Sequence, residues 1–235
     1  MPAVRPLTVE SPGTVGPLGQ YAVVPPPLPY VRAVVAVSVD GATTGFPADV
    51  ARFYELAGRV PEDVTLTGAD TILAQEEALA AAPPGPGPAA SGPLLAVVDS
   101  QARVRSWSAL RDAGHWRDVV ALRSRATQPR PTERVRELVR GDKRVDLRAA
   151  LAALAADGAR AVRVDSGGDL LGALLDGGLL DEVGLLIHPY LAGAGGGHWT
   201  GRARAGARLA LVEDSRPGGD LLWLRYRVTG PREPG

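Results

Sequence analysis

The chain has 235 residues, 45% of them hydrophobic, and its 26 Lys and Arg residues balance its 26 Asp and Glu residues. This length exceeds that of a disulfide-stapled miniprotein and suits one large α/β domain. Balanced charge argues against a nucleic acid or an anionic membrane as the partner. The absence of cysteine excludes a disulfide framework and a thiolate nucleophile. Because the chain shows neither a signal peptide nor an apolar run of about 18 residues, we expect a cytoplasmic protein.

The first 29 residues contain eight of the 21 prolines and show neither a helical nor a strand period. Proline fixes φ and lacks the amide donor that a β-ladder needs. We therefore predict an extended or disordered arm over residues 1–29 and a folded domain over residues 30–230. A second stretch rich in proline and glycine, residues 83–93, is interpreted as a loop inside that domain, because neither side of it is complete as a separate core.

Apolar, β-branched runs alternate with helical patterns along the domain. Strands are predicted at 31–39, 63–68, 94–99, 118–123, 159–166 and 182–191, followed by a hairpin of 207–213 and 220–228. Helices are predicted at 47–58, from Asp70 toward Ala80, and at 132–140, 146–157 and 169–176. This order predicts an α/β fold with helices on both faces of a mostly parallel central sheet and a C-terminal antiparallel hairpin.

The most informative local pattern is a strand followed by Asp165-Ser166-Gly167-Gly168-Asp169 and a helix. Glycines at a helix N-terminus let backbone amides approach a ligand, and the unpaired amides favour a phosphate or pyrophosphate. Asp169 could instead cap those amides itself, so an ordinary strand-to-helix turn is the alternative. A similar turn runs from Thr67 to Thr71, and two such turns at the carboxyl edge of one sheet would flank a nucleotide-binding crevice.

Other chemistries have weaker support. The string DSGG also occurs around the nucleophile of trypsin-like proteases, so a serine hydrolase using Ser166 is an alternative, although neither His115 nor His188 lies in a recognisable triad context. The histidines lack metal-ligand spacing, and we expect no metal. The glycine-rich stretch 193–201 is interpreted as a flexible loop.

Several strings, in order, are similar to the pyrimidine reductase of the riboflavin pathway, which occurs alone or as the carboxyl-terminal half of a bifunctional deaminase-reductase. They are Pro29-Tyr30-Val31 leading into Ser38-Val39-Asp40-Gly41, then Gly68 to Ile72, Val97 to Val104, and VDSGGDLLGALLDGGLLDEVGLLIHPYLAG from Val164 to Gly193. The resemblance covers about residues 29–229. It implies a dihydrofolate-reductase-like, three-layer α/β/α fold. Because no deaminase zinc motif precedes these strings, the resemblance implies a stand-alone reductase.

The resemblance also implies a homodimer that transfers hydride from NADPH to the C1 position of a ribosylamino-pyrimidine 5′-phosphate. Asp165, at the family's glutamate position, would bind the acceptor or its proton. Asp40 is a second catalytic candidate, although its position is typical of a turn. The cofactor would contact Val37, Gly68, Thr71, Ser100, Ser166, Gly167, Gly168, Asp169 and Leu170.

The chain departs from the family pattern on the substrate side. Val34 and Gln75 occupy substrate-side positions where the family commonly has a basic or amide residue and an acidic residue, respectively. Neutral residues near Ala57 and Ala80 replace arginines that would hold the substrate phosphate, unless Arg52 or Arg59 substitutes for them. The acceptor could therefore be the riboflavin precursor or a different heterocycle. A nucleotide-binding relative that has lost catalysis is the remaining alternative.

Overall fold

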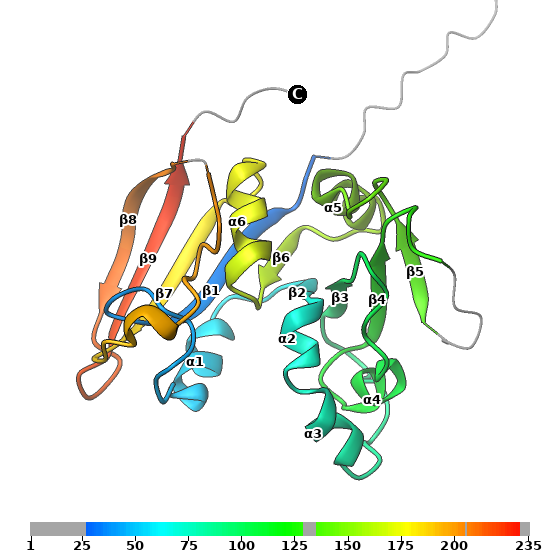
Figure 1. The fold of residues 1–235 in the computed structure, drawn as a ribbon, viewed down its shortest axis with the longest axis horizontal. Helices are drawn as coiled ribbons and strands as arrows, with labels where there is room; N and C mark the ends of the chain where they lie inside the picture. Colours follow the sequence, from blue (N-terminus) through cyan, green and yellow to red (C-terminus); the bar gives the residue numbers. More distant parts are fainter. Residues whose placement is uncertain (1–26, 129–134, 205, 231–235) are drawn as a thin grey trace, which may run out of the picture.

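The computed structural model describes residues 27–128, 135–204 and 206–230, which are built around one nine-stranded sheet (Figure 1). The strand order is β5-β4-β3-β2-β6-β1-β7-β9-β8. All neighbours from β5 to β7 pair in parallel, whereas β9 is antiparallel to both β7 and β8. This confirms the mostly parallel sheet and the C-terminal hairpin. The strands are β1 (Tyr30–Ser38), β2 (Val64–Gly68), β3 (Leu94–Val98), β4 (Asp118–Arg123), β5 (Arg136–Val139), β6 (Ala161–Val164), β7 (Glu182–His188), β8 (Arg208–Ser215) and β9 (Leu222–Thr229).

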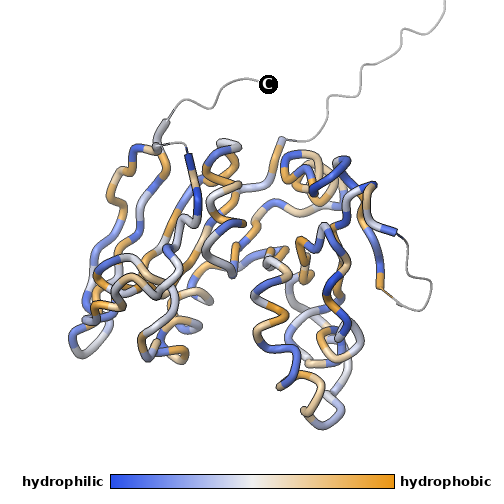
Figure 2. The backbone as a smooth tube through the Cα atoms, viewed as in Figure 1, coloured by the Kyte–Doolittle hydropathy of each residue, from blue (hydrophilic) through white to orange (hydrophobic). Residues whose placement is uncertain are grey.

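Helices cover both faces of the sheet, because the central strands carry apolar side chains on both sides. Helices α5 (Leu147–Ala156) and α6 (Gly168–Asp176) pack on one face through residues such as Leu151 and Leu171. On the other face lie α1 (Val50–Ala57), α2 (Ala69–Leu73), α3 (Glu76–Ala81) and α4 (Trp107–Asp112). Figure 2 shows hydrophobic residues concentrated along the central strands and the inner sides of the helices.

Capping residues fix several helix ends where the sequence indicates them. Asp146 accepts a hydrogen bond from the amide of Ala149 (3.0 Å) at the start of α5, and Gly158, with φ of +97°, follows its end. Asp49 caps α1 by accepting from the amide of Arg52 (2.9 Å), so this helix starts three residues later than the proline at position 47 suggests. The single helix predicted from Asp70 toward Ala80 is interrupted at Gln75, where α2 gives way to α3.

The helix predicted over residues 132–140 is wrong. Residues 136–139 form β5, the edge strand that pairs in parallel with β4, from Val120 opposite Arg136 to Arg123 opposite Val139. Residues 129–134 lie outside the described part. Pairing with β4 is a tertiary contact that overrides the weak local helical pattern. The short helix α4 was not predicted.

Residues 1–26 of the predicted N-terminal arm lie outside the described residues, and the described chain begins with Leu28 packed against the core. The stretch 83–93 is a loop without regular structure, as predicted. Among the described residues, no helix has both the length and the apolar composition needed to cross a membrane.

Candidate active site

A groove of about 450 Å³ opens at the carboxyl edge of the sheet, where β2, β3 and β6 end. Parallel strands present the loops that follow them at this edge, which is the usual ligand-binding position in open α/β sheets. Four residues predicted to contact a cofactor line the groove: Gly68, Ser100, Asp169 and Leu170. The remaining lining residues are Ala69, Asp70, Val98, Gln101, Arg103, Lys143, Arg144, Val145, Leu147 and Ala173.

The turns after β2 and β6 touch each other at one side of this groove. The hydroxyls of Thr71 and Ser166 are hydrogen-bonded at 2.7 Å. A Cβ on Gly68 would lie 3.4 Å from Ser166 Oγ and 3.8 Å from Leu170 Cδ2, which are ordinary contact distances, so Gly68 packs directly beside the turn after β6. The two strand-to-helix turns that the sequence singles out therefore form one continuous wall.

The first turn of α6 is partly engaged by the protein itself. Gly167 is the N-cap and supplies no side-chain cap. The amide of Gly168 donates to Trp199 O (2.9 Å), and the backbone of Gly201 lies so close that a Cβ there would be 2.5 Å from Gly168 C. The Gly168 amide, which is predicted to contact a pyrophosphate, thus donates to the loop after β7 in this structure. A ligand can approach α6 from the groove side, where Asp169 and Leu170 lie.

Asp169 does not cap α6, contrary to the alternative interpretation of this turn. Its carboxylate pairs with Arg202, Nη2 to Oδ2 at 2.8 Å, and both side chains are exposed. The hydrogen bond from Arg202 lowers the pKa of Asp169 below its usual value. The carboxylate is therefore turned outward toward the loop after β7.

A buried ion pair holds the loop that follows β3. Asp99 and Arg123 are each 1% exposed, and Arg123 Nη1 lies 2.8 Å from Asp99 Oδ2. The same carboxylate accepts from the amides of Arg103 (2.9 Å) and Val104 (3.0 Å), and Ala102, directly before them, has a positive φ of 52°. These contacts fix the segment that carries Ser100, Gln101 and Arg103 into the groove. Sequence reasoning missed this pair, although an aspartate directly after a buried strand and an arginine inside an apolar strand are visible signals.

Ser100 connects this loop to the start of α5. Its Oγ accepts a hydrogen bond from the amide of Val145 (3.0 Å). Two exposed cations, Lys143 and Arg144, directly precede Val145 and line the groove. Arg103 supplies a third cation and pairs with Asp70, Nη2 to Oδ1 at 2.7 Å. Two carboxylates, Asp70 and Asp169, also line the groove, so its lining carries three positive and two negative side chains, with Lys143 and Arg144 beside Ser100. This cluster of cations was not predicted.

Asp165 lies at the end of β6, on the sheet face that α1 to α4 cover. Burial raises its pKa above the usual range, Glu62 raises it further, and the opposite charge of Arg163 acts against both. The pKa of Tyr54, on α1, is also raised, by burial and by the charge of Asp165. Asp165 and Tyr54 therefore face a common region between α1 and β6. This arrangement is suited to holding or moving a proton.

Three other predicted site residues lie elsewhere. Val34 is 3% exposed and packs with α1 in the core, and Val37 lies in the core on the opposite face. Gln75 is exposed at the junction of α2 and α3. Of the predicted residues, Gly68, Ser100, Asp169 and Leu170 line the groove, whereas Thr71 and Ser166 are joined to each other in the adjoining turns and Val34, Val37 and Gln75 do not line it.

Asp40 serves the turn after β1. It accepts from Ser38 Oγ (2.5 Å) and from the amides of Ala192 (3.1 Å) and Gly193 (2.8 Å). These hydrogen bonds, with that from Ser38 first, lower the pKa of Asp40 to about 2. Its carboxylate therefore fastens the loop after β7 to the loop after β1.

Among the described residues, no histidine is hydrogen-bonded to Ser166 as the base of a serine hydrolase would be. The hydroxyl partner of Ser166 is Thr71. Buried His188 accepts at Nε2 from the amide of Asp49 (2.9 Å), and His198 Nδ1 pairs with Thr200 Oγ1 (2.8 Å). No group of three or more His, Cys, Asp or Glu side chains able to hold a metal ion exists in the described part of the chain.

Comparison with known proteins identifies the family. The RibD C-terminal domain profile matches residues 29–221. The 2,5-diamino-6-ribosylamino-4(3H)-pyrimidinone 5′-phosphate reductase of Methanothermobacter thermautotrophicus is 31% identical over 228 residues, which cover 86% of this chain and 99% of that protein.

Two solved structures share the fold. A pyrimidine reductase-like protein from Corynebacterium diphtheriae is similar with a TM-score of 0.66 at 19% identity, over 86% of this chain and 93% of that one. Dihydrofolate reductase from Enterococcus faecalis, solved with NADP(H), is similar with a TM-score of 0.52 at 10% identity, over 86% and 97% of the two chains. These two structures confirm the dihydrofolate-reductase-like fold, and the family profile with the 31% identical reductase confirms the oxidoreductase class that the sequence resemblance implies. The chain belongs to the RibD C-terminal domain family.

Proposed function

We propose that this chain is a cytoplasmic enzyme that uses NADPH to reduce 2,5-diamino-6-ribosylamino-4(3H)-pyrimidinone 5′-phosphate, or a closely related heterocycle, at a C=N or C=O group. The observation that carries this proposal is the groove where Gly68, Ser100 and Leu170 meet three cations, in a chain similar to a named reductase of this substrate. A groove of about 450 Å³ is in the range of small-molecule sites.

The residues of the groove fit a phosphorylated dinucleotide. Gly68 lines the groove at the turn after β2, and the Thr71–Ser166 hydroxyl pair offers polar contacts beside it. Lys143, Arg144 and Arg103 would hold a phosphate near Ser100, which favours NADPH over NADH because only NADPH carries a 2′-phosphate. The cofactor itself would supply the hydride, and the protein would orient it and exclude water.

The acceptor would bind on the α1 side of β6, near Asp165. A carboxyl group with a raised pKa carries a proton closer to neutral pH, so Asp165 would bind the acceptor or manage its proton. Arg52 and Arg59, the candidates for a replacement phosphate clamp, both pair with Glu55 on the surface of α1. The arginines that would hold the substrate phosphate therefore differ from the family pattern. The proposed substrates for this reason include a heterocycle whose phosphate-bearing part differs from that of the family substrate.

The cofactor half is tested by titrating NADPH and NADH while their fluorescence is followed. We expect the native protein to bind NADPH more tightly than NADH. Lys143→Gln should weaken NADPH binding about tenfold, because it removes one charge-assisted contact, and should leave NADH binding unchanged. Arg160→Gln, an exposed charge change outside the groove, is the matched control and should alter neither.

Separate outcomes would contradict the cofactor assignment, the catalytic activity and the reaction class. If both the native protein and Lys143→Gln bound NADPH and NADH with equal affinity, this would contradict the proposed contact between the cations of the groove and the 2′-phosphate of NADPH. Tight NADPH binding without turnover of the pyrimidine phosphate or of related imines would favour the catalytically lost relative instead. A serine hydrolase would show ester hydrolysis that Ser166→Ala abolishes, and we expect none.

We also propose that the chain forms a homodimer. Strand β8 is an edge of the sheet, and two of its apolar side chains, Leu211 and Val212, are 55% and 39% exposed. An unpaired edge strand with exposed apolar residues is favourable for pairing with a second copy. Light scattering coupled to size exclusion should give twice the mass of one chain.

A further inference from the structure

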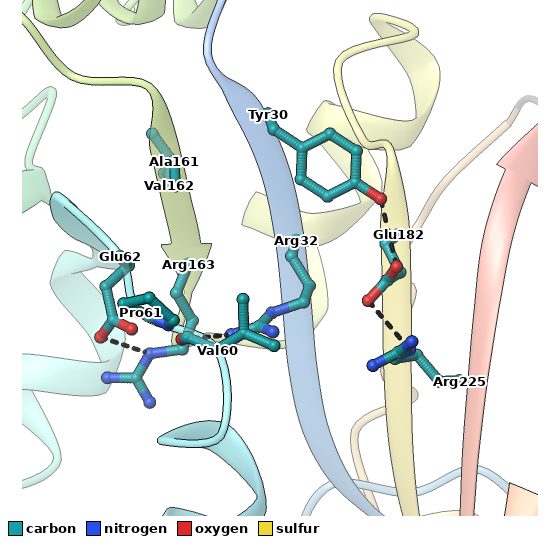
Figure 3. Close-up of a pocket in the computed structure, with 10 residues that line it drawn as sticks. All are labelled: Tyr30, Arg32, Val60, Pro61, Glu62, Ala161, Val162, Arg163, Glu182 and Arg225. Carbon is teal, nitrogen blue, oxygen red and sulfur yellow. Dashed lines mark hydrogen bonds and ion pairs between the residues drawn. The ribbon is translucent and has the colours of Figure 1, made fainter. Parts of the chain in front are cut away.

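A second pocket, of about 170 Å³, lies where β1, β6 and β7 begin, at the opposite end of these strands from the groove (Figure 3). Five of its ten lining side chains are charged, and these five come from strands β1, β6, β7 and β9 and from the loop between α1 and β2. The lining residues are Tyr30, Arg32, Val60, Pro61, Glu62, Ala161, Val162, Arg163, Glu182 and Arg225.

Both carboxylates of the pocket are already paired. Glu62 accepts from Arg163 Nε (2.9 Å), and both side chains are almost buried. Glu182 accepts from Tyr30 Oη (3.1 Å) and lies 3.4 Å from Arg225 Nε. Arg225 also pairs with Glu213 outside the pocket, at 3.2 Å.

Arg32 is the charge that this network leaves unpaired. It is 7% exposed, and its Nη2 donates to the carbonyls of Ala57 (3.2 Å) and Val60 (3.0 Å). Within the described residues, no carboxylate forms an ion pair with it, and its Nε and Nη1 make no hydrogen bond. Burial lowers the pKa of Arg32, against the opposing effect of Glu182 and Glu62. The guanidinium lies between the Glu62–Arg163 pair and the Glu182–Arg225 pair (Figure 3).

The pocket wall carries three arginines and two glutamates, hence a formal charge of +1 (3 − 2) centred on Arg32. Among the described residues, the buried side-chain nitrogens without a hydrogen-bond partner include no atom of Arg32, so the free donors of its guanidinium are open to the pocket. A small anion with several oxygen acceptors would supply both the charge and the acceptors that Nε and Nη1 lack. The pocket has room for such a group, since its volume is several times that of a water molecule.

We propose that this pocket is a binding site for a small oxyanion, a phosphate or carboxylate group, held by Arg32. The site is separate from the groove, because the two share no lining residue. Arg32 also holds the last residue of α1 and the loop after it through the carbonyls of Ala57 and Val60. Bound anion therefore stabilises the junction of α1, β1 and β6.

Thermal unfolding in inorganic phosphate tests the site, with chloride replacing phosphate at constant ionic strength. At about ten times its dissociation constant, phosphate should raise Tm by about 3–6 °C. Arg32→Gln should abolish this rise, and so should Ala161→Leu, which fills the pocket without changing its charge. Lys143→Gln, which alters only the groove, should retain the rise. Parallel titrations with acetate distinguish a carboxylate site from a phosphate site.

Ala161→Leu keeps the test decisive if Arg32→Gln does not fold, because a folded Ala161→Leu variant that still responds to phosphate contradicts the proposal. A rise that disappears in Lys143→Gln but persists in Ala161→Leu would place the anion in the groove and also overturn it. No rise with phosphate or with acetate in the native protein would show that the arginine network is closed and binds no oxyanion.

Discussion

At the scale of single residues, the pKa values of two aspartates at strand ends are shifted in opposite directions, because the surroundings of Asp40 stabilise its charged form and those of Asp165 destabilise it. Asp40 is exposed and receives hydrogen bonds from Ser38 Oγ and two backbone amides, which lower its pKa to about 2. Asp165 is partly buried beside β6, and loss of hydration raises its pKa. The turn therefore favours the charged form of Asp40, whereas burial favours the neutral form of Asp165.

Asp165 should make stability depend on pH in a definite direction. Its folded-state pKa lies above the ordinary value of 3.8, so its favourable contribution is complete below that pH and is lost as the pH rises through the folded-state pKa. Asp165→Asn stays neutral at every pH. We expect this variant to have a higher Tm than the native protein at neutral pH, by about 2–4 °C, and an equal Tm in acid. A higher native Tm at neutral pH would contradict the assignment.

Turnover gives a second test of Asp165. If this carboxyl handles the acceptor or its proton, Asp165→Asn should lower kcat about 100-fold while NADPH affinity stays unchanged. Asp165→Glu is the matched variant, because it keeps the carboxyl group and restores the glutamate that the family resemblance expects. Steady-state kinetics should show turnover in Asp165→Glu. An equal decrease of kcat in Asp165→Asn and Asp165→Glu would indicate that Asp165 contributes to packing and not to catalysis.

At the scale of elements, the loop after β3 depends on the buried pair of Asp99 and Arg123. This one carboxylate receives the guanidinium and two amides of the loop that carries Ser100 and Arg103. Arg123 also lies 3.4 Å from Glu137 (Nε to Oε1), but Asp99 is its nearer and fully buried partner and the acceptor for both loop amides, so replacing Asp99 removes the contact that holds the loop.

Asp99→Asn should lower the free energy of unfolding by about 3–5 kcal/mol, measured by urea denaturation. It should also weaken NADPH binding, because the loop that lines the groove loses its anchor. Arg125→Gln is the control: its pair with Asp142 is exposed at 71% and 83%, and its removal should cost about 0–1 kcal/mol. If Asp99→Asn and Arg125→Gln changed the free energy of unfolding and the NADPH affinity by similar amounts, the Asp99–Arg123 pair would not be what positions the loop.

Elements with a strong apolar period or a clear cap were predictable, and those that depend on distant contacts were not. The apolar run of β1 and the Asp146 cap of α5 carry their own signals. The strand β5 has mostly exposed side chains and exists through pairing with β4, so its local sequence was misinterpreted as a helix. Helix α4 is only six residues long, too short to show a period.

The candidate site likewise contains residues that local sequence patterns predict and residues that only tertiary contacts bring into place. Gly68, Thr71 and Ser166 follow strands in the sequence, and parallel topology alone brings them to one edge. Lys143 and Arg144 reach the groove only because α5 packs opposite the loop after β3, and nothing near them in the sequence indicates a ligand. Val34 and Val37 were assigned by position in a family pattern, but burial on β1 decides where their side chains lie.

At the scale of the whole molecule, a chain with no net charge separates its charges locally. Cations line one side of the groove at the carboxyl edge, and Arg32 leaves a positive charge in the pocket at the opposite end of the strands. Net neutrality therefore argues against a polyanionic partner and remains compatible with two sites for small phosphorylated or carboxylated molecules. The central sheet holds the two sites apart, since strands β1 and β6 run between them.

Hydride transfer from NADPH to the pyrimidine phosphate is the central claim, and an isotope label tests it most directly. The protein is incubated with NADPH carrying deuterium at both C4 positions and with 2,5-diamino-6-ribosylamino-4(3H)-pyrimidinone 5′-phosphate, the substrate named for the 31% identical relative. Mass spectrometry of the product should show a ribitylamino compound that has gained a single deuterium. A reduced product without deuterium, or no product while NADPH is bound, would contradict the claim.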